Sequence, residues 1–279
     1  MPELPEVEAV CRRLEPYLSH QQITRVELRR PDLRSPFPRD FRARLEGQTV
    51  ASLTRRAKYL VAALSSRETL LMHLGMSGSF RVDAPGNASV DGDGRSAEPD
   101  RHDHVIFHLA SGAVVTFNDP RRFGSMDLLT PMQLARHGVL SRLGPEPLSS
   151  SFDAVSLARA CRGKKVSLKV ALLDQRVVAG LGNIYAVEAL YTAGLSPFRR
   201  ASTIATPSGA PRDTAVRLVR AIKHVLVRAI DRQVRDYRSS RFRVYDREGK
   251  RCLRARCGGT VARRLQAGRS TFYCPVCQK

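Results

Sequence analysis

Four cysteines near the C-terminus constrain the fold of this chain more than any other feature of its sequence. They are Cys252, Cys257, Cys274 and Cys277, with the spacing Cys-x4-Cys-x16-Cys-x2-Cys. Two such pairs are typical of a tetrahedral four-thiolate zinc site, and in a cytosolic chain a metal is favoured over disulfides. A segment of roughly 35 residues is too short to bury a core of its own, so we expect zinc to supply its folding free energy. The pattern predicts one closed, structural zinc site.

The charge of the chain predicts a polyanionic partner. Its 279 residues include 47 Lys and Arg but only 26 Asp and Glu, which gives a formal net charge of +21. This excess favours nucleic acid or an anionic membrane surface. No apolar stretch approaches the roughly 18 residues of a membrane span. The N-terminus also lacks the basic residues followed by an apolar run that are typical of a signal peptide. We therefore expect a cytoplasmic protein that does not enter a membrane; its charge alone does not distinguish DNA from RNA.

The first half of the chain is predicted to be mainly β. It opens with a helix, because apolar residues recur at helical spacing at Val7, Val10, Cys11, Leu14 and Leu18. Short apolar runs separated by polar turns then predict strands. These runs cover residues 23–28, 49–53, 60–64 and 69–74, followed by a hairpin of residues 105–109 and 114–117.

The second half is predicted to be helical until the cysteine-bearing tail. Two prolines in the segment LGPEPL, residues 143–148, mark a rigid connector. Apolar residues at helical spacing between Ala215 and Ile230 predict a long helix whose other faces are basic and solvated. We expect three domains, with the boundaries 1–138, 139–240 and 241–279.

The residues after Met1 combine a nucleophile with a carboxylate. Removal of Met1 from the opening MPELPEV would leave the secondary amine of Pro2 as the N-terminus, with Glu3 beside it. A terminal amine has a pKa of about 8, against about 10.4 for lysine, so more of it is neutral and nucleophilic at pH 7. Its attack on an aldehyde-like sugar carbon gives an iminium. The same residues also suit an ordinary helix start, because Pro5 fits a first helical position.

Three further motifs have both a structural and a functional interpretation. In GLGNIYAVEAL, residues 180–190, glycines before a helix either only start that helix or aim N–H groups and the Asn183 amide at a phosphate. In DPRRFG, residues 119–124, Phe123 is either a core residue or a wedge between base steps, with Arg121 replacing an extruded base. In HLGMSG, residues 73–78, Met76 is either core or a second space-filling residue.

These motifs, taken in order, resemble those of one enzyme family along the whole chain. The matching segments are PELPEVE, RRAKYL, HLGMSG, DPRRFG, LGPEPL, GLGNIYA and the cysteine-bearing end FYCPVCQK. In order and spacing they resemble the formamidopyrimidine-DNA glycosylases of base-excision repair. The resemblance implies an α+β multidomain fold: an N-terminal β-sandwich with flanking helices, a helix-two-turn-helix domain and a C-terminal zinc-finger β-hairpin. It also implies a monomer that acts on double-stranded DNA containing oxidised bases or abasic sites, and hence an association with the nucleoid.

The resemblance assigns roles to individual residues. Pro2 is the implied nucleophile on C1′, Glu3 the proton donor to the sugar ring oxygen, and Glu6 a carboxylate that supports the pocket. Lys58 and Arg269 complete the implied catalytic set through contacts to DNA phosphate, although Lys58 by itself is most simply a surface lysine at a strand start. The implied DNA-contacting residues are His73, Met76, Arg121, Phe123, Lys164 and Asn183.

The implied activity is a bifunctional one, in which the enzyme excises formamidopyrimidine and 8-oxoguanine and then cleaves the strand by β,δ-elimination. Two alternatives stay open: the same chemistry on a broader or pyrimidine lesion range, and a zinc-ribbon DNA-binding protein that has lost catalysis. The sequence departs from the family in three places. The first cysteine pair encloses four residues rather than two, the excursion Asp83–Asp103 is long, and only Arg238–Arg243 stand where a longer loop usually covers the flipped base. The short connection predicts a more open pocket.

Overall fold

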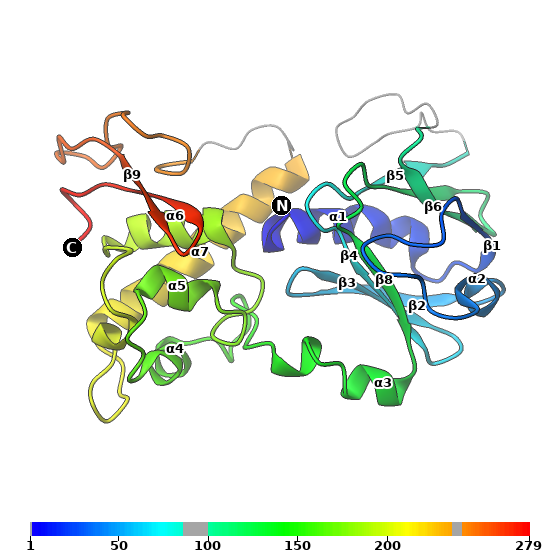
Figure 1. Ribbon diagram of the computed structural model, residues 1–279, viewed down its shortest axis with the longest axis horizontal. Helices are drawn as coiled ribbons and strands as arrows, with labels where there is room; N and C mark the ends of the chain where they lie inside the picture. Colours follow the sequence, from blue (N-terminus) through cyan, green and yellow to red (C-terminus); the bar gives the residue numbers. More distant parts are fainter. Residues whose placement is uncertain (1, 86–99, 236–241) are drawn as a thin grey trace. The chain divides into compact units, whose positions relative to one another are not determined.

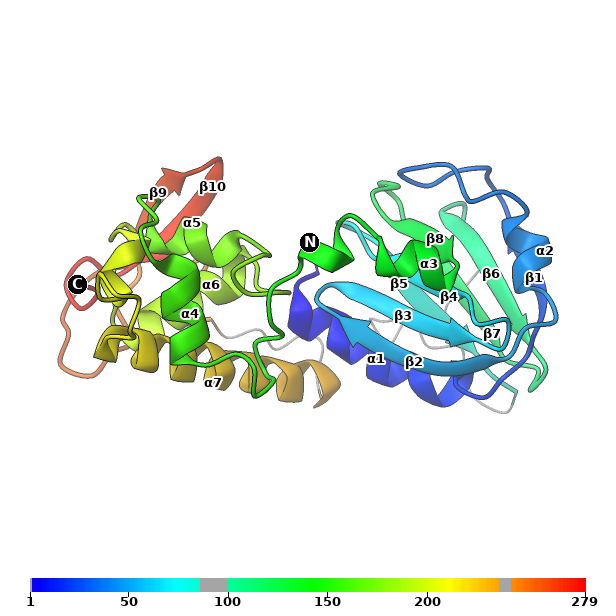
Figure 2. The same cartoon turned by 90° about the horizontal axis from the view of Figure 1, so that it is seen from below.

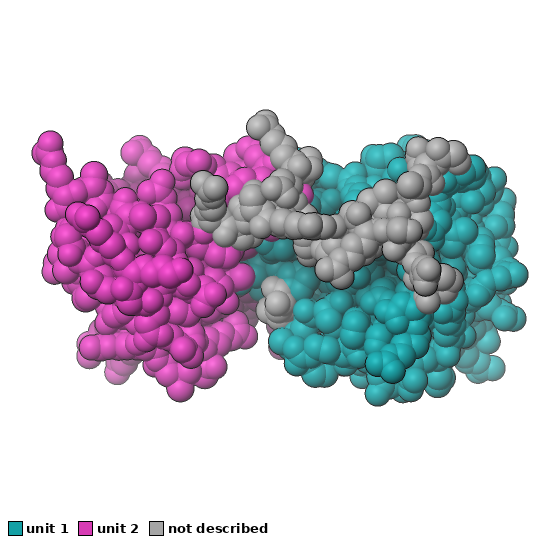
Figure 3. Space-filling view, turned by 90° about the horizontal axis from the view of Figure 1, so that it is seen from above, with its two compact units in different colours: residues 1–141, 236–238 teal, residues 142–235, 239–279 magenta. Residues whose placement is uncertain are grey.

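The computed structural model describes residues 2–85, 100–235 and 242–279, which form two compact units (Figures 1 and 3). The first unit contains residues 2–85 and 100–141, and the second contains residues 142–235 and 242–279. Most of the excursion that follows Asp83 and most of the connection that begins at Arg238 lie outside the described residues. Within the described part of the chain, no helix is both long and apolar enough to span a membrane.

The first unit is a sandwich of two four-stranded antiparallel sheets (Figure 2). One sheet has the order β1-β6-β7-β5, with the bounds β1 Ile23–Leu28, β5 Ser79–Asp83, β6 Asp103–Leu109 and β7 Val114–Asn118. The other has the order β2-β3-β4-β8, with the bounds β2 Val50–Arg56, β3 Tyr59–Leu64, β4 Thr69–His73 and β8 Ser125–Leu129. Inward side chains of both sheets form one apolar core, as the alternating burial along β3 illustrates.

Helix α1 (Leu4–Leu18) packs against the sandwich through its apolar stripe. All five residues predicted for that stripe are buried. Two short helices, α2 (Phe41–Leu45) and α3 (Pro131–Ala135), complete the unit. Strands β5 and β8 were not predicted from the sequence, and each directly follows one of the glycine-bearing motifs. They are edge strands: β5 pairs with β7, and β8 pairs with β4.

The second unit is helical and ends in a hairpin. Its elements are α4 Ala154–Cys161, α5 Leu168–Leu173, α6 Asn183–Ala193, α7 Asp213–Arg235, β9 Ala262–Gln266 and β10 Arg269–Tyr273, with a 3-10 turn at Ala201–Ile204. The predicted long helix is α7, and its apolar positions from Ala215 to Ile230 are buried as expected. Helices α5 and α6 are joined by a turn at residues 175–177 followed by a bend at residues 178–180, the connection expected of the helix-two-turn-helix motif. A smaller core joins α6 to the cysteine-bearing tail through Val187 and Tyr191.

Candidate functional site

The start of α1 holds two acidic side chains in place beside Pro2. Glu3 is the N-cap residue, and it forms a capping box with Glu6 in which the Glu3 N–H donates to Glu6 Oε2 at 2.9 Å. Only 3% of Glu3 is exposed. The ordinary interpretation of this segment as a helix start is therefore confirmed. A helix start at this position is compatible with a catalytic role for the same residues, because it positions the buried Glu3 carboxylate next to Pro2, the candidate nucleophile.

The turn that carries Lys58 is tied to α1 by an arginine. This turn joins β2 to β3, and its residue Ala57 has a φ of +52°. Arg55 donates through Nη1 to the Ala57 carbonyl at 2.9 Å and through Nε to Glu8 Oε2 at 2.8 Å. Burial raises the pKa of Glu8, but hydrogen bonds from Arg55 and Arg12 outweigh that effect and leave the pKa below its usual value. The ionised Glu8 thus links the Lys58 turn to the helix that begins beside Pro2.

His73, at the end of β4, is a neutral imidazole at pH 7. Burial, followed by the positive charges of Lys58 and Arg34, lowers its pKa to about 4. Its Nδ1 accepts a hydrogen bond from the Gly75 N–H at 3.0 Å, which places the ring proton on Nε2. His73 can therefore donate one hydrogen bond to a ligand without bringing a positive charge.

Two adjacent loops carry the residues expected to fill a gap in the duplex. Met76 and Phe123 are both 42% exposed, so the structure places neither of them in the core. The Arg121 guanidinium lies 4.9 Å from the centroid of the Phe123 ring, a cation–π contact at the surface. Exposed apolar side chains beside an unburied arginine suit contact with nucleic-acid bases.

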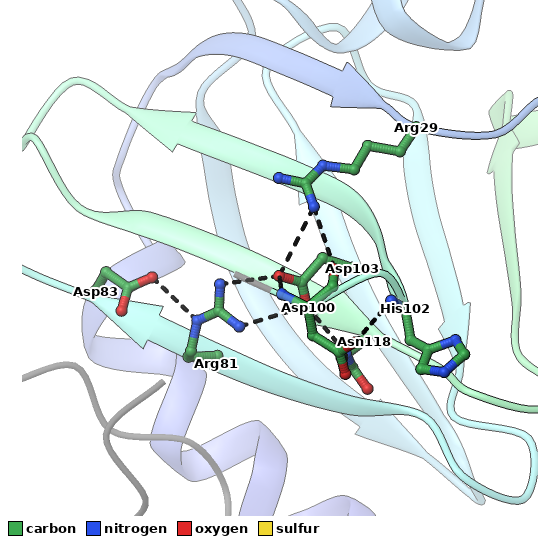
Figure 4. Close-up of polar contacts among 7 residues, drawn as sticks. All are labelled: Arg29, Arg81, Asp83, Asp100, His102, Asp103 and Asn118. Atoms are coloured by element: carbon green, nitrogen blue, oxygen red, sulfur yellow. Dashed lines mark hydrogen bonds and ion pairs between the residues drawn. The ribbon is translucent and has the colours of Figure 1, made fainter. Parts of the chain in front are cut away.

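A buried polar network anchors β7 just before the second of these loops (Figure 4). The Asp103 carboxylate is fully buried and accepts from Arg81 Nη2 at 3.1 Å and from Asn118 Nδ2 at 2.9 Å. Burial raises the pKa of Asp103, but these bonds and one from the Asp100 N–H outweigh it and leave the pKa below its usual value. Arg29 adds a hydrogen bond to the Asp100 carbonyl at 3.2 Å. The network therefore fixes Asn118, the last residue of β7, after which the loop of Arg121 and Phe123 begins.

In the second unit, the glycine turn before α6 is held by a glutamine. Gln175 accepts from the Gly180 N–H at 2.9 Å and donates to the Leu181 carbonyl at 2.8 Å. Gly180 has a φ of +80°, a conformation that a side chain would strain. Asn183 begins α6, and its Nδ2 donates to the Ser270 carbonyl of β10 at 3.0 Å. Its Oδ1 is buried without a hydrogen-bond partner among the described residues.

Lys169 is a buried lysine that the sequence analysis did not single out. Its side chain is fully buried, and its Nζ donates to Thr271 Oγ1 at 2.6 Å and to the Ser270 carbonyl at 3.3 Å. Burial, followed by the positive charge of Arg269, lowers its pKa to about 8. The only signal in the sequence is a lysine inside the apolar run LKVALL of α5. Lys169 and Asn183 together attach the hairpin to the two-turn motif.

The hairpin tip presents Arg269 to solvent. Ala267 and Gly268 form the two-residue turn between β9 and β10, with φ values of +48° and +72°, as a type I′ turn requires. Arg269 is the first residue of β10 and is exposed. Lys164 lies in the loop that follows α4 and is half-buried. Both cations belong to the same unit as Asn183.

The four cysteines converge as the spacing predicted. Their sulfur atoms all lie within 4.8 Å of one another, with Cys252 and Cys277 Sγ 3.8 Å apart and Cys257 and Cys274 Sγ 3.6 Å apart. A tetrahedral zinc ion with Zn–S bonds of about 2.3 Å needs sulfur atoms about 3.8 Å apart. The four-residue spacing of the first pair therefore leaves the ligand geometry intact. This is a site for one structural zinc ion.

The candidate residues are divided between the two units. The first unit contains Pro2, Glu3, Glu6, Lys58, His73, Met76, Arg121 and Phe123, and the second contains Lys164, Asn183, Arg269 and the four cysteines. Within the first unit, Arg55 brings the Lys58 turn to α1. Within the second, the hairpin brings Arg269 to the helix-two-turn-helix motif.

Comparison with known protein families covers almost all of the chain. The formamidopyrimidine-DNA glycosylase N-terminal domain matches residues 1–126, and the H2TH domain of the same glycosylases matches residues 143–240. Residues 249–279 match a zinc finger found in FPG and IleRS. The chain belongs to the formamidopyrimidine-DNA glycosylase family. It is therefore an enzyme, a DNA glycosylase, and the predicted fold class and structural zinc are confirmed.

Individual members of the glycosylase family are similar over their full length. The formamidopyrimidine-DNA glycosylases of Bradyrhizobium diazoefficiens and Rhodopseudomonas palustris are 54% and 55% identical, with all of both chains covered. The crystal structure of the Lactococcus lactis enzyme bound non-covalently to DNA containing an AP site is similar with a TM-score of 0.84 and 30% identity, again with full coverage of both chains. A complex of that enzyme with DNA containing Fapy-dG has a TM-score of 0.84 and 29% identity.

The low pKa of Lys169 predicts how stability depends on pH. Between about pH 8 and pH 10.5 the unfolded chain keeps this proton and the folded chain releases it, so the unfolding free energy should rise with pH in that window. Compared with Lys169→Met, the native chain should gain about 3 kcal/mol across it. Chemical denaturation at pH 7.5, 9 and 10.5 measures the difference. Parallel pH profiles for the two proteins would contradict the prediction.

Proposed function

We propose that this glycosylase excises oxidised purines from duplex DNA through an N-terminal proline nucleophile and then cleaves the abasic site by β,δ-elimination. The observation that carries the proposal is the start of α1, where a nearly buried Glu3, held in a capping box with Glu6, directly follows Pro2. Once Met1 is removed, Glu3 is a fixed carboxylate beside a terminal secondary amine, an arrangement for which a binding protein would have no use. The inactive zinc-ribbon alternative is therefore disfavoured.

The proposed chemistry uses the chain's own groups. The lone pair of the Pro2 nitrogen forms a bond to C1′ of the damaged nucleotide, and the glycosidic bond breaks with its electron pair leaving on the base. The N–H proton that Pro2 loses is taken up by the departing base. The bond between C1′ and the ring oxygen then opens, and Glu3 donates its proton to that oxygen. The resulting iminium acidifies the C2′ hydrogen. Loss of that proton expels the 3′-phosphate, and loss of the C4′ proton in a second elimination expels the 5′-phosphate. Water then hydrolyses the bond between Pro2 and C1′ and releases Pro2.

The proposed DNA contacts come from both units. Lys58, Lys164 and Arg269 are basic side chains suited to phosphate, and Asn183 and the neutral His73 can each donate a hydrogen bond. Met76, Arg121 and Phe123 are proposed to occupy the space that the flipped nucleotide leaves. The net charge of +21 supports attraction to the polyanion. We propose that the enzyme works as a monomer associated with the nucleoid.

The proposed lesion range rests on the short connection from Arg238 to Arg243, of which residues 236–241 lie outside the described part of the chain. So short a segment can join its neighbours but is too short to enclose a purine as well. Each missing hydrogen bond to the base removes about 0.5 to 1.5 kcal/mol of discrimination, or a few-fold to roughly tenfold in relative rate. Selectivity should therefore be broad, extending to hydantoins and oxidised pyrimidines.

A panel of lesion duplexes tests this function. Single-turnover rates should be high for formamidopyrimidines and abasic sites, and 8-oxoguanine should exceed oxidised pyrimidines by no more than about tenfold. Strand cleavage should leave phosphate at both ends of the gap, as β,δ-elimination requires. A strong preference for 8-oxoguanine opposite cytosine over every other lesion would refute the broad range. The absence of excision from every duplex would refute the proposed function.

A further inference from the structure

We propose that Ser77 and Asp119 are positioning residues that form a clamp between the two loops expected to enter the duplex. One loop carries Met76, and the other carries Arg121 and Phe123. The inference rests on the proposed function, because it concerns how these three side chains are held ready for the moment when the base leaves the stack.

Asp119 is a buried carboxylate for which the proposed chemistry has no use. It is fully buried, and its two oxygens divide their hydrogen bonds between the loops. Oδ1 accepts from Ser77 Oγ at 2.5 Å, and Oδ2 accepts from the Gly124 N–H at 2.7 Å. The first bond crosses to the Met76 loop, and the second closes the loop of Arg121 and Phe123 on itself. Hydrogen bonds to a charged acceptor are among the stronger ones in proteins.

Ser77 extends the clamp to the backbone of the arginine. Its Oγ donates to Asp119 and also accepts from the Arg121 N–H at 3.2 Å. One hydroxyl thus joins the residue after Met76 to the amide of Arg121. The Arg121 side chain itself contacts the Phe123 ring.

The two loops also touch through their backbones. A Cβ on Gly75, whose φ is +62°, would lie 2.3 Å from the carbonyl carbon of Phe123 and 2.4 Å from the Gly124 nitrogen. A Cβ on Gly124 would lie 2.8 Å from the buried Phe117 ring. Side chains are excluded from this junction on both sides, so the loops are packed as one body rather than as two separate ones.

The clamp is anchored in the sheet below it. Asp119 directly follows Asn118, whose amide is held by Asp100 and Asp103 (Figure 4). The Asp119 N–H donates to the His102 carbonyl at 3.0 Å, and the Asp119 carbonyl is 3.0 Å from His104 Nε2. Both the backbone and the side chain of Asp119 are therefore fixed before any ligand arrives.

Such rigidity has a direct consequence for base extrusion. Side chains that fill a gap in the duplex must compete with the base for its place in the stack. If they are already in position, less conformational entropy is lost in the transition state, and a displacement of about 1 Å can cost up to a hundredfold in rate. Loss of the clamp should therefore slow lesion excision more than it weakens DNA binding.

The test compares Ser77→Ala with a matched control, Ser65→Ala. Ser65 also donates from its hydroxyl to a side-chain oxygen, Gln48 Oε1 at 2.8 Å, and accepts from a backbone N–H, that of Thr49 at 3.0 Å. Ser77→Ala should lower the single-turnover rate of 8-oxoguanine excision about tenfold and cleavage of a preformed abasic site less than threefold. Ser65→Ala should change neither. Ser77→Thr, which keeps the hydroxyl, should restore excision, and 2-aminopurine fluorescence beside the lesion should report slower extrusion in Ser77→Ala only.

A double-mutant comparison separates failure of the clamp from failure of the wedge. In an Arg121→Ala background, Ser77→Ala should lower excision by a smaller factor than it does in the native chain, because one of the three positioned side chains is already gone. If Arg121→Ala slows excision and Ser77→Ala does not, the proposed positioning role of Ser77 is wrong, whereas the proposed role of Arg121 in filling the gap is retained. If Arg121→Ala itself leaves excision unchanged, the wedge assignment in the proposed function fails. Equal losses in excision and abasic-site cleavage for Ser77→Ala would show a merely structural role and overturn the inference.

Discussion

A variant in which one glutamate is inserted between Met1 and Pro2 should lose the covalent chemistry and keep DNA binding. The insertion prevents removal of Met1, so Pro2 becomes an internal residue with no free amine, whereas Glu3, Glu6 and the rest of α1 are unchanged. We expect excision and abasic-site cleavage to fall at least about a thousandfold, which corresponds to about 4 kcal/mol of lost transition-state stabilisation. Affinity for an uncleavable abasic-site analogue should change less than about threefold.

Borohydride trapping provides the measurement. The native chain should be trapped on abasic-site DNA, and mass spectrometry should place the adduct on the peptide that begins with Pro2. Lys58→Met is the control: it removes the amine carried by the turn that Arg55 ties to α1, and it should slow trapping without moving the adduct. An adduct on Lys58 in the native chain would overturn the assignment of the nucleophile.

Removal of zinc should disrupt the second unit without melting the sandwich. In Cys274→Ser one ligand of a closed four-sulfur set is replaced, and structural zinc sites of this kind contribute about 10 kcal/mol or more of apparent binding free energy. The small core around Val187, Tyr191 and Phe272 then loses its support, and with it the hairpin that carries Arg269. We expect less than half an equivalent of zinc by elemental analysis. DNA affinity should fall at least about tenfold.

A matched control separates loss of the ligand from loss of a buried thiol. Cys161 is fully buried in the same unit and outside the cluster, and burial raises its pKa to about 11, so it is a packing residue. Cys161→Ala should keep one zinc per chain and the native DNA affinity. In a thermal scan, Cys274→Ser should show an early transition for the second unit and an unchanged one for the sandwich. A native chain that contains well under one equivalent of zinc would contradict the prediction.

The sequence by itself determined those features whose physical cause is local. The stripe of α1 and the apolar face of α7 follow from helical periodicity, and both lie buried where the spacing placed them. The strand β1 was predicted with its observed bounds, because a short run containing Ile23 and Val26 between polar turns indicates a strand without reference to distant partners. The zinc site was predicted because the chemistry of four thiolates is carried by the residue type and spacing alone.

Only the tertiary structure decided which polar groups became buried and which apolar ones stayed exposed. Ser77 meets Asp119 across 42 residues of sequence, and Lys169 meets Thr271 across 102, distances over which no local pattern carries information. The same holds for Phe123, whose sequence allowed either a core residue or an exposed one. Burial of a polar group is favourable only when its partners arrive from elsewhere in the fold, so such sites are specified by non-local packing rather than by propensity or periodicity.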